Sequence, residues 1–108
     1  MGTSWYTWHV RIISRKTLRR FWEQPGHKDA EQPLRAWFAE AKKTQWKKPA
    51  DIKRQYRSAS FVGKDRVVFN IAGNKYRLIV AFKYAFGTGF IRFVGTHSQY
   101  DRIDVEKV

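Results

Sequence analysis

The chain contains no cysteine among its 108 residues. This absence excludes disulfide bonds, thiolate metal sites and cysteine nucleophiles, and it is typical of a reducing compartment. No apolar run approaches the roughly 18 residues that are needed to cross a bilayer. The first nine residues lack both the basic and the apolar region of a signal peptide. We therefore expect a cytoplasmic protein without a membrane partner.

Acidic residues are scarce. The chain has 9 Asp and Glu against 22 Lys and Arg, which gives a net charge of +13. Such an excess raises the self-repulsion of the folded state, so a negatively charged partner is expected. Nucleic acid, and RNA in particular, is the leading candidate, and an acidic protein is the second. A membrane surface ranks third, because the basic residues are spread along the chain rather than gathered on one amphipathic helix.

The length fits one domain, which we assign to residues 10–108, with residues 1–9 as a separate N-terminal extension. A short buried strand is predicted at 10–13. Apolar residues at helical spacing then predict two helices, the second of which ends near Lys43. The two apolar stripes, which we interpret as core rather than as a cofactor site, are Leu18, Phe21 and Trp22, and Leu34, Trp37, Phe38 and Ala41.

From residue 66 onward the period of the apolar residues changes from about 3.6 to 2, which predicts strands. We expect strands at 66–71, 75–84 and 90–96, joined by turns at 72–74 and 86–89. The predicted fold is therefore α+β. Two N-terminal helices pack on one face of a small, mainly antiparallel sheet, and a short helical turn follows at the C-terminal end.

Alternation along the strands sorts their side chains onto two faces. The predicted core face is apolar and comprises Val67, Phe69, Ile71, Tyr76, Leu78, Val80, Phe82, Ile91 and Phe93. The predicted opposite face mixes cations with apolar residues and comprises Arg66, Val68, Asn70, Lys75, Arg77, Ile79, Ala81, Lys83, Phe90, Arg92, Val94 and Thr96.

Arg77 and Arg92 are the cations of interest on this second face. A solvated sheet surface accounts for many exposed cations, but no Asp or Glu lies on the three strands. Like charges on adjacent strands destabilise a sheet unless an anion binds them, and arginine's planar fork suits a phosphate. We interpret the face as phosphate-binding, with Asn70 and Lys83 as further RNA contacts.

A second basic region lies between the predicted helices and the sheet. Its cations are Lys47, Lys48, Lys53, Arg54 and Arg57. Charge density alone makes them candidate RNA-binding residues, and a solvated linker is the alternative.

The last predicted strand is followed by His97, Tyr100 and Asp101. On a helical turn the spacing i, i+3, i+4 places an imidazole, a phenol and a carboxylate on one side. The alternative is a Tyr–Asp pair that caps a terminal helix, with the histidine merely at a strand end.

Two motifs resemble the HigB family of bacterial toxins, within the wider RelE-like group. The first is FNIAGNKYRL at 69–78, and the second is RFVGTHSQYD at 92–101. Residues 48–53, KPADIK, are similar to the family's linker between helices and sheet. The resemblance covers about residues 10–104.

The resemblance implies a toxin that cleaves messenger RNA, in many relatives on the translating ribosome, and that is silenced by a HigA-like helix-turn-helix antitoxin. It also implies a ribonuclease without metal or other cofactor, in which a 2′-hydroxyl attacks its own phosphate. The three histidines of this chain have no metal-ligand spacing. Within such a mechanism, Arg77 and Arg92 suit charge stabilisation and His97 suits proton transfer. Supporting candidates are Lys75, Tyr100 and Asp101.

Two other functions stay open at this point. A non-catalytic RNA-binding module, such as an accessory ribosomal or tRNA-binding domain, would use the same basic face without needing His97. A basic partner of an acidic protein would need no nucleic acid at all.

Overall fold

The computed structural model describes residues 10–108, and the predicted extension at 1–9 lies outside the described residues. The elements follow one another along the chain as β1 (Arg11–Ile13), α1 (Arg15–Trp22), η2 (Lys28–Ala30), α2 (Glu31–Lys43), α3 (Pro49–Gln55), β2 (Ser60–Val62), β3 (Arg66–Ile71), β4 (Tyr76–Lys83), η3 (Tyr84–Phe86), β5 (Thr88–Thr96) and α4 (His97–Tyr100).

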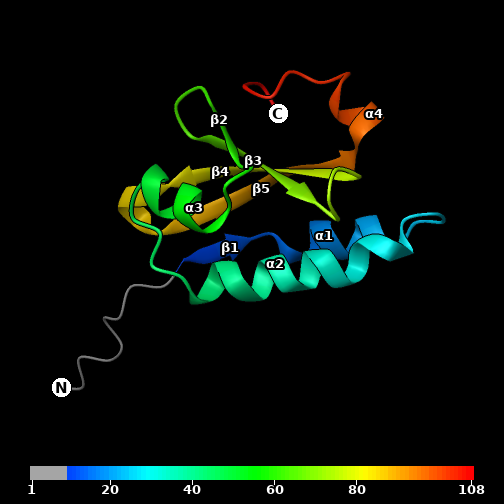
Figure 1. Ribbon diagram of the computed structural model, residues 1–108, viewed down its shortest axis with the longest axis horizontal. Helices are drawn as coiled ribbons and strands as arrows, with labels where there is room; N and C mark the ends of the chain where they lie inside the picture. Colours follow the sequence, from blue (N-terminus) through cyan, green and yellow to red (C-terminus); the bar gives the residue numbers. More distant parts are fainter. Residues whose placement is uncertain (1–9) are drawn as a thin grey trace.

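The five strands form one sheet in the order β1-β5-β4-β3-β2 (Figure 1). The pairs β2–β3, β3–β4 and β4–β5 are antiparallel, whereas β1 runs parallel to β5. The α+β class is confirmed, but the sheet is mixed and the helices are not confined to the N-terminal part. The prediction missed β2 and the parallel pair, because β1 and β2 are too short to show a period of their own.

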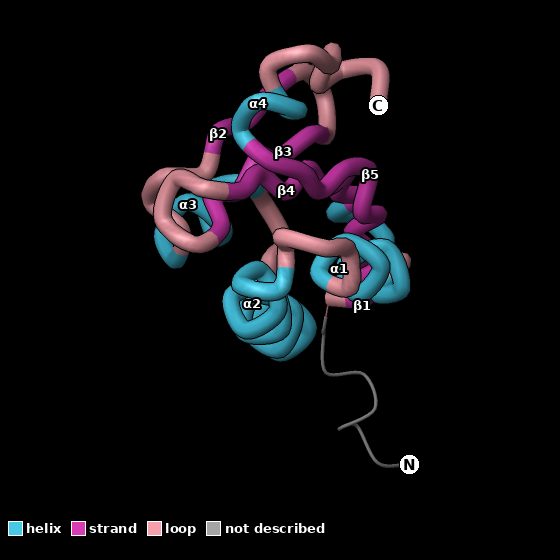
Figure 2. The backbone as a smooth tube through the Cα atoms, turned by 90° about the vertical axis from the view of Figure 1, so that its right-hand side faces the viewer, coloured by secondary structure: helices cyan, strands magenta, loops and turns pink. Residues whose placement is uncertain are grey.

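Helices α1 and α2 lie against one face of the sheet (Figure 2). The two predicted stripes are buried as expected, with Leu18 and Leu34 fully so, and only Phe38 is partly exposed. Burial of a leucine side chain contributes about 1.5–3 kcal/mol. None of the helices in the described part of the chain is long and apolar enough to cross a membrane.

Aromatic side chains join the helical layer to the sheet. The ring of Trp37 on α2 meets that of Phe69 on β3, with centroids 5.2 Å apart in an edge-to-face arrangement. Trp46, in the loop after α2, packs on Phe69 and on Phe82 of β4. Aromatic pairs favour particular ring orientations and stabilise the fold beyond the area that they bury, so they hold the helices in one position over the strands.

A β-bulge interrupts the pairing of β4 with β5. Val80 pairs with Ile91, but the preceding residue, Ile79, pairs with Phe93. Arg92 is therefore an extra residue on β5. A bulge of this kind shifts the alternation of side chains by one position beyond it.

This shift makes three assignments from the sequence wrong. Phe93 lies on the face of Ile79 rather than in the core face, whereas Val94 and Thr96 lie on the core face opposite Leu78 and Tyr76. Strict alternation could not reveal this, because the position of a bulge depends on the partner strand.

The second face of the sheet is partly covered. Val68, Ile79 and Ala81 are buried there, with 3%, 0% and 0% of their surface exposed. The C-terminal segment runs on this side of the sheet, opposite α1 and α2 (Figures 1 and 2), and Arg66 Nη2 donates to the Val108 carbonyl at 2.6 Å. What remains accessible on this face lies toward its ends and along β5.

Candidate functional site

Arg77, the second residue of β4, is only 8% exposed. Its Nη1 donates to the carbonyl oxygens of Asn74 and Tyr76 at 3.0 and 3.3 Å, and its Nη2 donates to Asn74 Oδ1 at 3.3 Å. The Cζ atom lies 5.7 Å from the centre of the Tyr100 ring on α4. The guanidinium is thus held between the turn before β4 and the helical turn after β5.

These contacts do not exhaust the donors of Arg77. A guanidinium has five N–H groups, and three hydrogen bonds to protein acceptors are formed within residues 10–108. Two N–H groups are left, which is the number that a bidentate pair with an oxyanion uses. Burial strengthens such an interaction, because the site is shielded from water.

Helix α4 begins where it does because of Thr96. Its hydroxyl accepts from the Gln99 backbone N–H at 3.1 Å, and the Gln99 side chain accepts from the Thr96 N–H at 2.9 Å. This reciprocal pair is a capping box. Gly95, opposite Arg77 in the register, makes room for it, since a Cβ there would lie 2.5 Å from Phe93 Cζ and 2.7 Å from Gln99 Oε1.

His97 and Asp101 lie one turn apart. His97 Nδ1 is 3.2 Å from Asp101 Oδ2, and the two side chains are 53% and 59% exposed. The His97 backbone N–H donates to the Lys75 carbonyl at 3.3 Å, which ties the start of α4 to the turn before β4. With Nδ1 directed at the carboxylate, Nε2 is the ring nitrogen left to exchange a proton with a bound molecule.

The structure therefore brings together one group of predicted residues at one end of the sheet. This group, here named the α4 cluster, consists of Arg77, His97, Tyr100 and Asp101. It contains a cation, a phenol, and an imidazole paired with a carboxylate. It can hold an anion and move a proton beside it.

Lys75 does not point into the α4 cluster. Its ammonium pairs with Asp29 of η2, which also accepts a hydrogen bond from the Tyr76 hydroxyl. The Lys75 partnership, followed by that with Tyr76, lowers the pKa of Asp29, and the hydrogen bond to Asp29 raises the pKa of Lys75. Asp29 was not foreseen, since nothing local marks a loop carboxylate as the partner of a lysine 46 positions away.

Arg92, the bulged residue, is exposed and lies over the Phe90 ring, with Cζ 5.7 Å from its centre. It is not directly opposite Arg77, whose partner Gly95 lies three positions further along β5. That offset corresponds to about 10 Å along the strand. Neither arginine has a carboxylate partner within residues 10–108.

Two other cations of this face, Arg66 and Lys83, share one carboxylate in a turn. Asp65, just before β3, pairs with both Arg66 and Lys83, and the hydrogen bond from Lys83 is the main cause of its lowered pKa. Asp65 is not on a strand, so the absence of Asp and Glu from the three strands gave no information about this partner. Asn70 lies directly across from Arg77, on β3.

The second basic region lies around α3, at the opposite end of the sheet from α4 (Figure 1). Asp51 accepts from the Lys47 backbone N–H at 3.0 Å, which lowers its pKa, and it lies 3.4 Å from Arg54 Nη2. Lys53 Nζ donates to the Ala59 carbonyl at 2.8 Å. This region, here named the α3 basic patch, comprises the exposed residues Lys47, Lys48, Lys53, Arg54 and Arg57.

The part of the chain that the structure describes holds no group of three His, Asp or Glu side chains able to bind a metal ion. The His97–Asp101 pair supplies two ligand groups and no third.

Comparison with known families places these elements in context. The model of one family, HigB_toxin, described as the RelE-like toxic component of a toxin-antitoxin system, matches residues 30–103. This range runs from the last residue of η2 through α4 and includes the α3 basic patch and the whole α4 cluster. No curated protein matches the chain. Since the match extends over most of the chain, the protein belongs to the HigB family of RelE-like toxins, and its partner is an antitoxin.

Proposed function

We propose that this toxin is an endoribonuclease that cleaves messenger RNA on the ribosome without a metal ion. The observation that carries the proposal is the α4 cluster, in which Arg77 contacts Tyr100 beside the His97–Asp101 pair. In the reaction a ribose O2′ forms a bond to the adjacent phosphorus and the P–O5′ bond breaks. The O2′ proton goes to a base and O5′ receives a proton, which leaves a 2′,3′-cyclic phosphate and a 5′-hydroxyl.

Arg77 holds the scissile phosphate in this mechanism. Negative charge builds on the non-bridging oxygens as the phosphorus becomes five-coordinate, and the two free N–H groups of Arg77 are fixed in advance by its bonds to Asn74. Donors that need no reorganisation stabilise a transition state more than a mobile lysine does. Arg92, exposed and without a carboxylate partner in the described chain, contacts a neighbouring phosphate.

His97 transfers one of the two protons through Nε2, because Asp101 occupies Nδ1. Tyr100, whose ring lies over Arg77, and Asp101 support that transfer. Lys75 acts as a positioning residue, since its ammonium is bound to Asp29 and its carbonyl holds the backbone of His97. Asn70, across from Arg77, contacts the RNA beside the cluster, and Lys83 contacts it at the other end of β4.

The α3 basic patch docks the toxin on ribosomal RNA. It lies at the far end of the sheet from the α4 cluster (Figure 1), so one surface anchors the protein while the other receives the message. A net charge of +13 supports binding to a polyanion of this size. The antitoxin is a HigA-like helix-turn-helix protein encoded beside the toxin, and both act in the cytoplasm.

The test uses purified toxin, programmed ribosomes and a short single-stranded RNA. The proposal expects fragments that end in a 2′,3′-cyclic phosphate or its 3′-phosphate hydrolysis product. A single 2′-deoxy substitution at the cleaved position should abolish the cut, because the attacking oxygen is gone. With the free RNA, EDTA should leave the rate unchanged.

Three results would contradict the proposal. Cleavage of the 2′-deoxy substrate would require water rather than O2′ as the nucleophile. Loss of cleavage in EDTA would require a metal ion. Tight ribosome binding without any cleavage would favour the non-catalytic RNA-binding module.

A further inference from the structure

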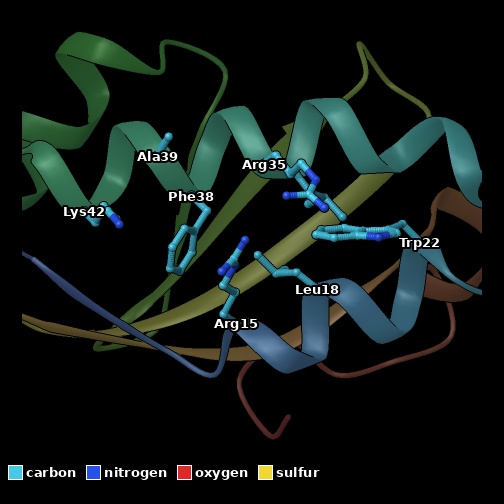
Figure 3. Close-up of a pocket in the computed structure, with 8 residues that line it drawn as sticks. Arg15, Leu18, Trp22, Arg35, Phe38, Ala39 and Lys42 are labelled. Atoms are coloured by element: carbon cyan, nitrogen blue, oxygen red, sulfur yellow. The ribbon is translucent and has the colours of Figure 1, made fainter.

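A groove runs between α1 and α2. Figure 3 shows side chains of both helices lining it, and its volume is about 290 Å³. Leu18, Trp22 and Leu34 form an apolar floor that belongs to the buried core, and the partly buried Phe38 packs against that core and also lines the groove. Its accessible apolar surface is continuous with the core, so covering the groove would extend that core outward.

Cations form the rim of this groove. Arg15 Cζ and Lys42 Nζ lie 5.3 and 5.6 Å from the centre of the Phe38 ring, and Arg35 Cζ lies 5.0 Å from that of Trp22. Because the start of α1 meets the end of α2, the two helices are antiparallel. A cation over a ring keeps its full charge.

The rim carries an excess of positive charge. No Asp or Glu lines the groove, and Arg35 is paired at 2.9 Å with Glu31, one turn earlier on α2. Arg15 and Lys42 have no ion-pair partner within residues 10–108. An apolar floor between uncompensated cations fits an occupant with an apolar stripe flanked by carboxylates.

The dimensions of the groove fit a helix. Its lining residues on α2 extend from Leu34 to Lys42, which corresponds to about 12 Å or two helical turns. Arg35 and Lys42 are seven positions apart on α2. A partner helix also presents the same face every seven residues, or two turns, so its side chains could meet both cations. An amphipathic helix with apolar residues at i, i+3 or i+4, and i+7 places its anchors on such a floor.

RNA suits this groove less well than a helix does. Single-stranded RNA binds aromatic rings by stacking bases on their faces. Here cations already lie over the rings of Phe38 and Trp22, so a base could stack on those ring faces only by displacing them. The remaining floor consists of leucine side chains, which offer no hydrogen bond to a base edge.

We propose that the groove between α1 and α2 is the docking site for an acidic amphipathic helix of the antitoxin. The inference rests on membership of the toxin family and on the groove itself, and it does not require the ribonuclease mechanism. The groove lies on the helical side of the sheet, whereas α4 lies on the other side (Figure 2). A helix bound there leaves the α4 cluster uncovered, so it blocks the toxin by its bulk at the ribosome or anchors a second segment that reaches the cluster.

The experiment reverses charge at the rim and compares it with an equal change elsewhere on the same helices. The groove variant is Arg15→Glu, Arg35→Glu, Lys42→Glu, and the control variant is Lys16→Glu, Arg20→Glu, Lys43→Glu. The control residues are exposed and line none of the described cavities, and both variants lower the net charge equally. Affinity for the product of the neighbouring gene is measured by calorimetry, and folding is measured by thermal melting.

We expect the groove variant to bind the antitoxin roughly 100-fold more weakly, and the control less than about threefold. Both should still arrest growth when expressed alone. Equal weakening in the two variants would overturn the proposal in favour of general electrostatic attraction. Retained antitoxin binding with loss of growth arrest would also overturn it, because the groove would then serve RNA or the ribosome.

A measurement on the unaltered protein keeps the proposal testable even if the groove variant does not fold. In an NMR titration with antitoxin, the indole N–H signal of Trp22 and the backbone signals of Arg35 and Phe38 should shift, whereas those of Lys16 and Arg20 should stay in place. Shifts confined to α4 and the opposite face of the sheet would show that the antitoxin binds elsewhere. Absence of ribonuclease activity would not affect this result, so failure of the two proposals can be told apart.

Discussion

The guanidinium of Arg77 lies 5.7 Å from the centre of the Tyr100 ring, although Arg77 lies at the start of β4 and Tyr100 follows the end of β5. Pairing of Arg77 with Gly95 brings the start of β4 beside the end of β5. This relationship assembles the α4 cluster from two motifs that are separate in the sequence. It also decides which substitutions should test the chemistry.

Replacement of Arg77 should reduce RNA cleavage more than it reduces stability. Arg77→Ala should lower the single-turnover rate roughly 10²–10³-fold, by analogy with loss of one oxyanion donor. Arg77→Lys should recover only part of this, because an ammonium cannot form a bidentate pair. Arg20→Ala on α1 is the matched control, since it removes an exposed arginine that lies on the other side of the sheet. Full activity in Arg77→Lys would show that charge alone suffices.

His97→Ala should lower the cleavage rate roughly 10²–10⁴-fold, as expected for loss of a general acid or base. The side chain is exposed, so the protein should stay folded and keep its affinity for the antitoxin. Asp101→Asn should have a smaller effect, because it leaves the imidazole in place and removes only the group that orients it. If His97→Ala retains full activity, the imidazole is structural, and Tyr100 is the remaining group of the α4 cluster that could carry the proton.

The α3 basic patch should control association with ribosomes. Lys48→Gln, Lys53→Gln and Arg57→Gln together should weaken ribosome binding and flatten its dependence on salt, because fewer counterions are released. The measurement is cosedimentation with ribosomes over a series of salt concentrations. Replacing Lys16, Arg20 and Lys43 with Gln removes the same charge from the helical side and should change the salt dependence little. Equal effects in both variants would point to net charge rather than to this surface.

Asp65 should make stability depend on pH in the acidic range. The hydrogen bond from Lys83 and then the charge of Arg66 lower its pKa in the fold below the ordinary value of an aspartate side chain. Between the folded and the unfolded pKa the unfolded chain binds more protons, so stability rises with pH. The contribution is fully present above the pKa of the unfolded chain and is lost as the pH falls through the lower, folded pKa.

Asp65→Asn tests this dependence. At neutral pH it should lower the free energy of unfolding by about 1 kcal/mol, since the ion pairs are partly exposed to solvent. The difference from the original protein, measured by urea unfolding at several pH values, should vanish in acid. A difference that stays constant down to pH 2 would show that packing rather than charge is responsible.

The sequence by itself determined the elements whose pattern is local. The stripes that begin at Leu18 and Leu34 become buried helix faces, and the alternation from residue 66 becomes β3 and β4. His97, Tyr100 and Asp101 share one turn and its C-cap because their spacing alone places them there. The family, too, was evident from two short motifs, since both depend on residues close together in the chain.

Only the tertiary structure decided which distant segments meet. The parallel pairing of β1 with β5, the bulge at Arg92 and the partnership of Asp29 with Lys75 all involve residues whose partners lie far along the chain. Local spacing contains no information about such pairs, because it is the packing of whole elements that selects one register or one ion pair among many. The groove between α1 and α2 arises in the same way. Each helix supplies part of the floor, and the cations of one helix meet the rings of the other only after the two have packed.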